Sequence, residues 1–72
     1  MAVVSAKDVQ SRAQEALAGS PVYALRDLTV KQQGKKLVIL GTLSSFYHKQ
    51  LAQEVVLTTA EGLEAVNSIE VL

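Results

Sequence analysis

Apolar residues near the start of the chain recur at the spacing of an α-helix. After Ser5, a plausible N-cap, the apolar positions fall three to four residues apart and so share one helix face; they are Val9, Ala13, Ala16 and Leu17. Residues 19–21 (Gly-Ser-Pro) end the pattern. The inner face is mostly alanine, which lets a helix axis lie close to a flat surface. We therefore expect a first helix that covers a sheet.

The middle of the chain alternates between apolar and polar residues, as β-strands do. One strand is predicted from about residue 25 to 31 and a second from 36 to 43, joined by a turn at residues 32–34 in which Gly34 can adopt a positive φ angle. One face of the second strand carries Leu37, Ile39, Gly41 and Leu43, and the other carries Val38, Leu40 and Thr42. Both faces are thus apolar, and a branched side chain at Gly41 is expected to overpack against a helix.

A second helix is predicted after the hairpin, with Ser44 or Ser45 as its N-cap and Gly62 as its end. Its inner stripe is expected to comprise Leu51, Ala52, Val55 and Thr59. A short last strand follows with Val66, Ile69 and Val71 as its apolar positions. These three depart from strict alternation, which suggests a β-bulge at Asn67.

The element order αββαβ defines an α+β fold, a two-layer sandwich in which two helices pack on one face of a three-stranded mixed sheet. Right-handed crossover geometry makes the last strand parallel to the second. The strand order is left open by this argument, and we favour the first strand in the middle. Residues 1–72 are expected to form a single domain with its core between about residues 5 and 72.

Composition narrows the function. The 72 residues include 7 basic and 7 acidic side chains, so the basic excess of nucleic-acid binders is absent and nucleic acid is not expected as a partner. The chain has no cysteine and no apolar run long enough to span a bilayer. Residues 1–4 are too short for the apolar part of a signal peptide. As written, the chain is expected to be cytoplasmic, and envelope-associated if it was trimmed from an exported protein.

A set of glycines, aliphatic residues and one asparagine recurs in a definite order from the hairpin onwards: Gly34, Leu37, Ile39, Gly41, Leu43, Ala52, Gly62, Leu63, Val66, Asn67, Ile69 and Val71. This set resembles the pattern of BON domains. The pattern is a glycine, V-x-L-x-G-x-V, a helix with a repeated alanine, G-V, and V-x-N-x-L-x-V. The resemblance spans about residues 9–72 and departs from the pattern at Leu63 and in the spacing after Asn67.

The resemblance implies a non-enzymatic binding module. BON domains generally occur in pairs or fused to other modules in envelope proteins, with proposed roles in binding phospholipid, peptidoglycan or partner proteins. The resemblance here covers a single copy of the pattern. Turn, packing and capping roles account for Gly34, Gly41 and Gly62.

No catalytic constellation stands out. His48 is the only histidine, and a structural role explains it best; nothing places it with Ser44, Ser45 and Asp27 as a nucleophile, base and orienting group. The glycine spacing fits neither a dinucleotide fingerprint nor a P-loop. We expect no enzyme activity, no cofactor and no metal.

Two surfaces are candidate contacts. Lys35 and Lys36 at the hairpin tip, together with Lys31, could meet an anionic membrane. Three lysines at about 1 kcal/mol each contribute too little without apolar insertion. Phe46 and Leu57, on one outward side of the second helix, could supply it. In the alternative, Phe46 folds over the edge of the core and Leu57 is an ordinary exposed leucine.

The second candidate is the open sheet face. Val38 and Leu40, joined by Leu72, could form a weak homo-oligomer or a docking strip for a partner protein.

Overall fold

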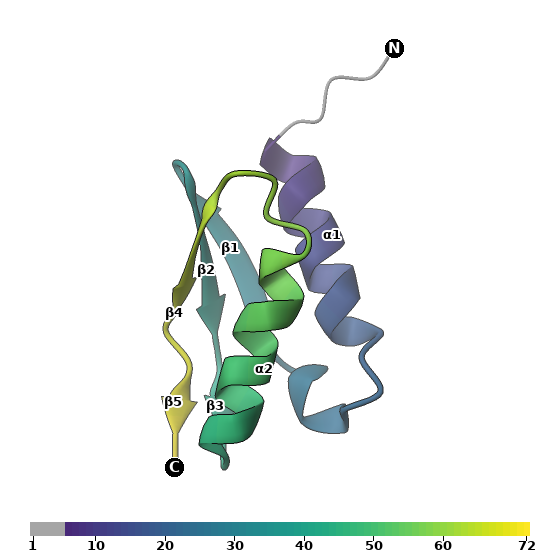
Figure 1. Ribbon diagram of the computed structural model, residues 1–72, viewed down its shortest axis with the longest axis vertical. Coiled ribbons are helices and arrows are strands. Elements are labelled where there is room, and N and C mark those ends of the chain that lie inside the picture. The colour runs from purple at the N-terminus through teal and green to yellow at the C-terminus, as the bar shows by residue number, and fades with distance from the viewer. Residues whose placement is uncertain (1–5) are drawn as a thin grey trace.

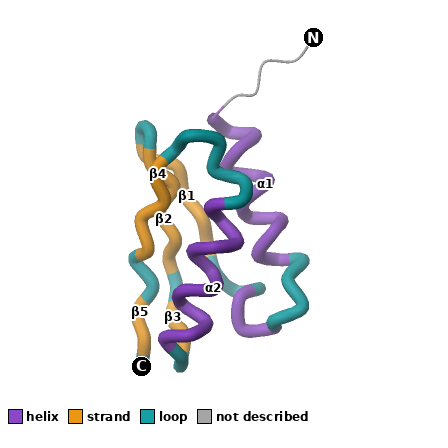
Figure 2. Tube along the Cα trace, viewed as in Figure 1, coloured by secondary structure: helices purple, strands orange, loops and turns teal. Residues whose placement is uncertain are grey.

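The computed structural model describes residues 6–72, which form two helices over one face of a sheet (Figure 1; Figure 2). The elements in chain order are α1 (Ala6–Ala18), a short 3₁₀ helix η1 (Tyr23–Leu25), β1 (Thr29–Gln33), β2 (Lys36–Leu40), β3 (Thr42–Leu43), α2 (Phe46–Leu57), β4 (Glu64–Asn67) and β5 (Glu70–Val71). The α+β class and the two-layer arrangement are confirmed. The expected N-cap Ser5 lies outside the described residues.

The first predicted strand begins later than the alternation suggested. Residues 23–25 form η1, and β1 starts only at Thr29. The hydroxyl of Ser20 accepts a hydrogen bond from the backbone N–H of Val22 at 3.0 Å and so favours a turn over a strand. Leu25 is fully buried. Because an apolar core residue occurs in strands as well as in short helices, Leu25 was counted as the first residue of the predicted strand.

The hairpin turn consists of Gly34 and Lys35, one residue later than expected, since Gln33 pairs with Lys36. Gly34 has a φ angle of 61°, as predicted from its position in the turn. A two-residue loop with glycine at a positive φ in its first position fits the right-handed twist of the flanking strands.

The strand order is β1-β2-β4, with β2 antiparallel to β1 and parallel to β4. The parallel crossover was predicted correctly, but the placement of the first strand in the middle was wrong. Strand β2 buries Leu37 and Ile39 on its helix side and half-buries Val38 and Leu40 on the other. A strand that is apolar on both faces is suited to the centre of a sheet.

The free edge of β1 is closed by side chains of α1. The side-chain amide of Gln14 donates to the carbonyl of Leu28 at 2.7 Å and accepts from the N–H of Val30 at 2.8 Å. One turn earlier, the Gln10 carbonyl oxygen accepts from the N–H of Gln32 at 2.9 Å. Gln14 thus pairs with β1 as the backbone of another strand would, which protects the edge from pairing with a foreign strand.

The parallel ladder continues from β2–β4 into β3–β5 without an inserted residue. Lys36 pairs with Glu64 and Thr42 with Glu70, so the two strands advance by the same number of residues. The N–H of Ser68 donates to the Ile39 carbonyl across the gap between the strand pairs. The β-bulge expected at Asn67 was therefore wrong.

Asn67 explains the irregular spacing in another way. Its amide group lies on the helix side of the sheet, where it donates to the carbonyl of Lys49 at 2.9 Å and accepts from the N–H of Ile69 at 3.3 Å. A polar residue thus occupies an inward position, and Val66 lies beside Val38 on the open face.

Helix α2 begins as predicted, with the Ser45 hydroxyl accepting from the N–H of His48 at 3.3 Å. It ends at Leu57, well before Gly62. The hydroxyls of Thr58 and Thr59 donate to the carbonyls of the last turn, at Val55 and Val56, and thereby compete with further helical bonds. Ala52 is buried as expected, and Val56 is a buried residue that the sequence analysis missed.

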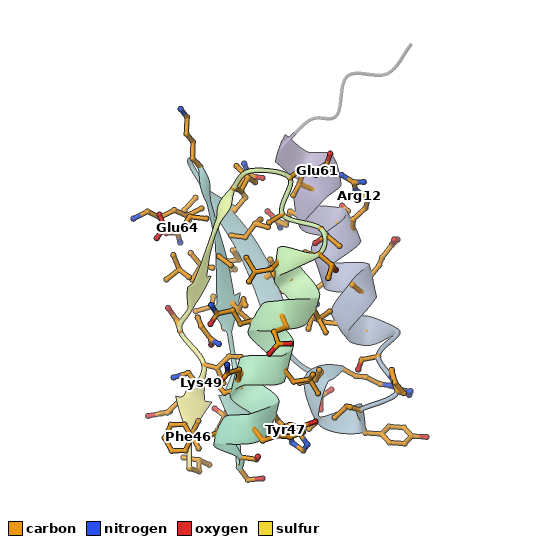
Figure 3. The ribbon with its side chains drawn as sticks, viewed as in Figure 1. Arg12, Phe46, Tyr47, Lys49, Glu61 and Glu64 are labelled. Atoms are coloured by element: carbon orange, nitrogen blue, oxygen red, sulfur yellow. The ribbon has the colours of Figure 1, made fainter. Side chains whose placement is uncertain are left out.

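The loop after α2 is tied back to α1. Glu61 forms an ion pair with Arg12 (Figure 3) and has a φ angle of 49°, which non-glycine residues rarely adopt. Gly62 follows with a φ angle of 90°. This turn directs the chain into β4, beside the hairpin tip.

The core is entirely aliphatic. It contains Val9, Ala13, Leu17, Leu25, Leu28, Val30, Leu37, Ile39, Leu43, Ala52, Val56, Ala60 and Ile69. The chain has two tyrosines, one phenylalanine and no tryptophan, and none of the three aromatic side chains belongs to this cluster.

Candidate binding surfaces

All three aromatic residues lie at one end of the elongated molecule. Tyr23 begins η1, and Phe46 and Tyr47 form the first turn of α2. The chain reaches this end after α1, leaves it along β1, and returns to it after β3 (Figure 1). The exposed fractions are 77% for Tyr23, 75% for Phe46 and 72% for Tyr47. We call Tyr23, Phe46 and Tyr47 the aromatic end.

The two aromatic residues of α2 point to different sides of the helix, Phe46 towards β5 and Tyr47 away from it (Figure 3). Each borders a shallow hollow. The hollow beside Phe46 has a volume of about 230 Å³ and is also lined by Lys49, Gln50, Gln53 and Asn67. The hollow beside Tyr47 measures about 300 Å³, with Gln50, Leu51 and Glu54 as its other walls. Both are open depressions that suit a surface contact better than an enclosed small molecule.

Cationic groups accompany the aromatic rings. The guanidinium carbon of Arg26 lies 4.1 Å from the centre of the Tyr23 ring, within range of a cation–π interaction. The Nε–H of Arg26 donates to the carbonyl of Ser20 at 2.8 Å and so holds Arg26 in place. Lys49 lies one turn after Phe46 and lines the same hollow.

The basic hairpin tip lies at the opposite end of the molecule. Lys36 and Leu43 are seven residues apart along one ladder, about 23 Å at 3.3 Å per residue, and α2 begins only after Leu43. The structure therefore does not bring Lys35 and Lys36 together with Phe46. Leu57 is half-exposed at the far end of α2, about 16 Å along the helix axis from Phe46.

Two of the three residues of the aromatic end were missed in the sequence analysis. Tyr23 follows the break at residues 19–21, and Tyr47 lies off the inner stripe of α2 that Ala52 and Val56 define. The available signal was compositional: the chain has few aromatic residues, and none falls at a predicted core position.

The open sheet face carries a small aliphatic patch of Val38, Leu40 and Val66. All three are half-buried, and none packs against the core. Val38 and Val66 are direct neighbours on β2 and β4. Leu72 does not join this patch. Its N–H donates to the carbonyl of Leu43, so Leu72 lies several residues beyond Leu40 along the strands. We call Val38, Leu40 and Val66 the open-face patch.

Charged residues flank the open-face patch with opposite signs. Lys36 on β2 is paired in register with Glu64 on β4, and Lys31 on β1 with Val38. Glu70 extends the acidic side along β5. Arg12 and Glu61 form the one ion pair among the described side chains. Lys36 and Glu64 are therefore neighbours on the sheet that do not form a salt bridge with each other.

The described residues hold no group of three histidine, cysteine, aspartate or glutamate side chains that could bind a metal ion. His48 is half-buried, and its ring centre lies 5.8 Å from that of Tyr47. Between residues 6 and 72, neither helix has the length and apolarity needed to cross a bilayer.

The fold and these surfaces define a small α+β domain with an exposed aromatic end and an uncovered sheet face. Comparisons with protein-family models, curated proteins and solved structures find no match for the chain.

Proposed function

We propose that this protein is a non-enzymatic binding module of the BON type that docks on phospholipid membranes through its aromatic end. The observation that carries the proposal is that every aromatic side chain is exposed at one end, although the core would gain stability from burying them. Exposed apolar side chains that gather at one end of a small domain are typical of contact surfaces.

The chemistry of the aromatic end suits the boundary between lipid tails and headgroups. Tyrosine combines an apolar ring with a polar hydroxyl and is enriched at membrane interfaces, while Phe46 supplies a purely apolar group. Arg26 and Lys49 lie beside the rings, where they can meet lipid phosphates. Asp27 follows Arg26 in the sequence, and Glu70 lies on β5, the strand towards which Phe46 points. Their two negative charges offset the two positive ones, so apolar insertion contributes more than attraction to anionic lipid.

The expected affinity is low. Full burial of one large apolar side chain contributes about 1.5 to 3 kcal/mol, and the rings would enter the interface only in part. The total is comparable to that of a single acyl chain, which anchors a protein only reversibly. We expect the module to need a high local concentration or a second attachment to remain bound.

Vesicle co-sedimentation and an NMR titration test this proposal. Phe46→Ser and Tyr47→Ser should each reduce binding to phosphatidylcholine vesicles at least fivefold, with little dependence on salt. Leu57→Ser, the matched loss of an exposed apolar side chain on the same helix, and Lys35→Glu/Lys36→Glu should bind like the wild type. Amide signals of residues 23 and 46–50 should shift.

Two results would contradict the proposal. If the lysine double variant abolished binding and Phe46→Ser did not, the hairpin tip would be the membrane contact. If peptidoglycan fragments shifted the signals of the aromatic end and vesicles did not, the surface would be right and the ligand class wrong.

A further inference from the structure

The open face has an arrangement of charge and apolar surface that matches itself after a twofold rotation. Across β2 and β4, Lys36 is the neighbour of Glu64, and Val38 is the neighbour of Val66. The basic and aliphatic members lie on β2, and the acidic and aliphatic members lie on β4. If a second copy is rotated by 180° about an axis that runs parallel to the strands between β2 and β4, β2 of each copy faces β4 of the other.

We infer that the partner of this face is a second copy of the chain, packed sheet to sheet about a twofold axis that runs parallel to the strands, between β2 and β4. In this arrangement Lys36 faces Glu64 of the second copy, and Val38 faces Val66 of the second copy. Twofold symmetry repeats both contacts. The aligned packing of two sheets is a common geometry for such faces.

Other twofold arrangements of the same face are less favourable. An axis directly over β2 places Lys36 against Lys36 of the second copy. An axis perpendicular to the strands, between Val38 and Leu40, places Glu64 against Glu70 of the second copy. Like charges in opposition disfavour both arrangements, so the charges select one orientation as well as one partner.

The size of the face sets the strength of the contact. In this arrangement the strand line of β2 and β3 and the strand line of β4 and β5 face the second copy, while β1 lies beyond its edge. Two strand lines about 4.8 Å apart and about 8 residues long give roughly 250 Å² per copy, or about 500 Å² in total, which is well below the usual range for stable complexes. The dimer should therefore dissociate on dilution and form in the high micromolar to millimolar range.

Charge reversal tests the orientation. Lys36→Glu places the new carboxylate against Glu64 of the second copy, and Glu64→Lys places two lysines together. Each variant alone should dimerise at least fivefold more weakly than the wild type at low salt, measured by sedimentation equilibrium. In an equimolar mixture of the two variants, both contacts become attractive between unlike chains. The mixture should dimerise at least as strongly as the wild type.

The mixture isolates the contact between molecules, because Lys36 and Glu64 are also neighbours within one chain. Inside each variant that neighbouring pair keeps like charges, so only an intermolecular contact can restore association. Lys35→Glu alters the net charge equally from the hairpin turn and should dimerise like the wild type. Val38→Thr/Val66→Thr should abolish dimerisation with a dispersed NMR spectrum retained.

Two outcomes would overturn the inference. One is a wild-type protein that stays monomeric at millimolar concentration. The other is a mixture that associates no better than its two components. If either charge reversal fails to fold, Lys36→Gln and Glu64→Gln remove the attraction without repulsion, and each should weaken the dimer while Lys35→Gln does not.

Discussion

Gly41 interrupts the strand between β2 and β3 with a φ angle of 144°. A Cβ atom at this position would lie 2.6 Å from Cδ2 of Leu28, a buried core residue. The sequence had predicted overpacking against a helix. The side chain that Gly41 approaches belongs instead to the segment before β1, so this glycine allows the sheet to close over Leu28.

We expect Gly41→Val to lower the free energy of unfolding by more than about 2 kcal/mol, because the substitution combines a steric clash with an unfavourable φ angle. Denaturant unfolding measures the loss. Gly34→Ala, in open space at a φ angle of 61°, serves as a control and should cost about 1 kcal/mol.

A second background separates the two causes. Gly41→Ala should cost less in a Leu28→Ala protein than in the wild type, since the clashing methyl group is gone and only the backbone strain remains. Equal costs in both backgrounds would show that the contact with Leu28 contributes nothing.

At the scale of the elements, the edge of β1 is protected by Gln14, whose side chain makes the hydrogen bonds that a neighbouring strand would make. Gln14→Ala leaves the N–H of Val30 and the carbonyl of Leu28 without their partner. We expect a loss of about 1 to 3 kcal/mol in the free energy of unfolding and faster amide hydrogen exchange at Val30.

Gln50→Ala is the matched control, because Gln50 is exposed on α2 and donates no hydrogen bond to the sheet in the described structure. It should change stability by less than about 0.5 kcal/mol. Unchanged exchange at Val30 in Gln14→Ala would mean that water replaces the glutamine without cost.

The elements themselves were predictable where one physical signal dominated. Periodic apolar residues located both helices, and the Ser45 cap and the positive φ of Gly34 followed from local chemistry. The prediction failed where a polar side chain bonds to the backbone. Ser20 turns the chain before Leu25, and Asn67 occupies an inward position that we assigned to a bulge. The Ser20 bond is local and the bond from Asn67 to Lys49 joins distant segments, but neither leaves a periodic trace in the sequence.

At the scale of the whole molecule, the candidate surfaces were predictable in part. Val38 and Leu40 lie on the open face as expected, whereas Val66, their neighbour on β4, was not predicted to lie there. The pairing of Phe46 with the hairpin lysines overlooked the path of the chain. A helix that returns to the hairpin tip must begin at the opposite end, so its first turn cannot lie beside Lys35 and Lys36.

The separation of an aliphatic core from an aromatic end also determines which spectroscopic signals the protein gives. With no tryptophan and no tyrosine in the core, intrinsic fluorescence comes from Tyr23 and Tyr47, which are already largely in water in the folded state. We expect tyrosine emission to change little across a denaturant transition that far-UV circular dichroism records clearly. Vesicles that capture the aromatic end should alter the same emission.

Tyr23→Phe and Tyr47→Phe, each of which removes one of the two emitters, would assign the vesicle response to its source. A large emission change that tracks unfolding would show that the rings are more protected than their exposure indicates. If tyrosine emission instead changes little on unfolding, Tyr23 and Tyr47 should report binding at the aromatic end without reporting the unfolding of the core.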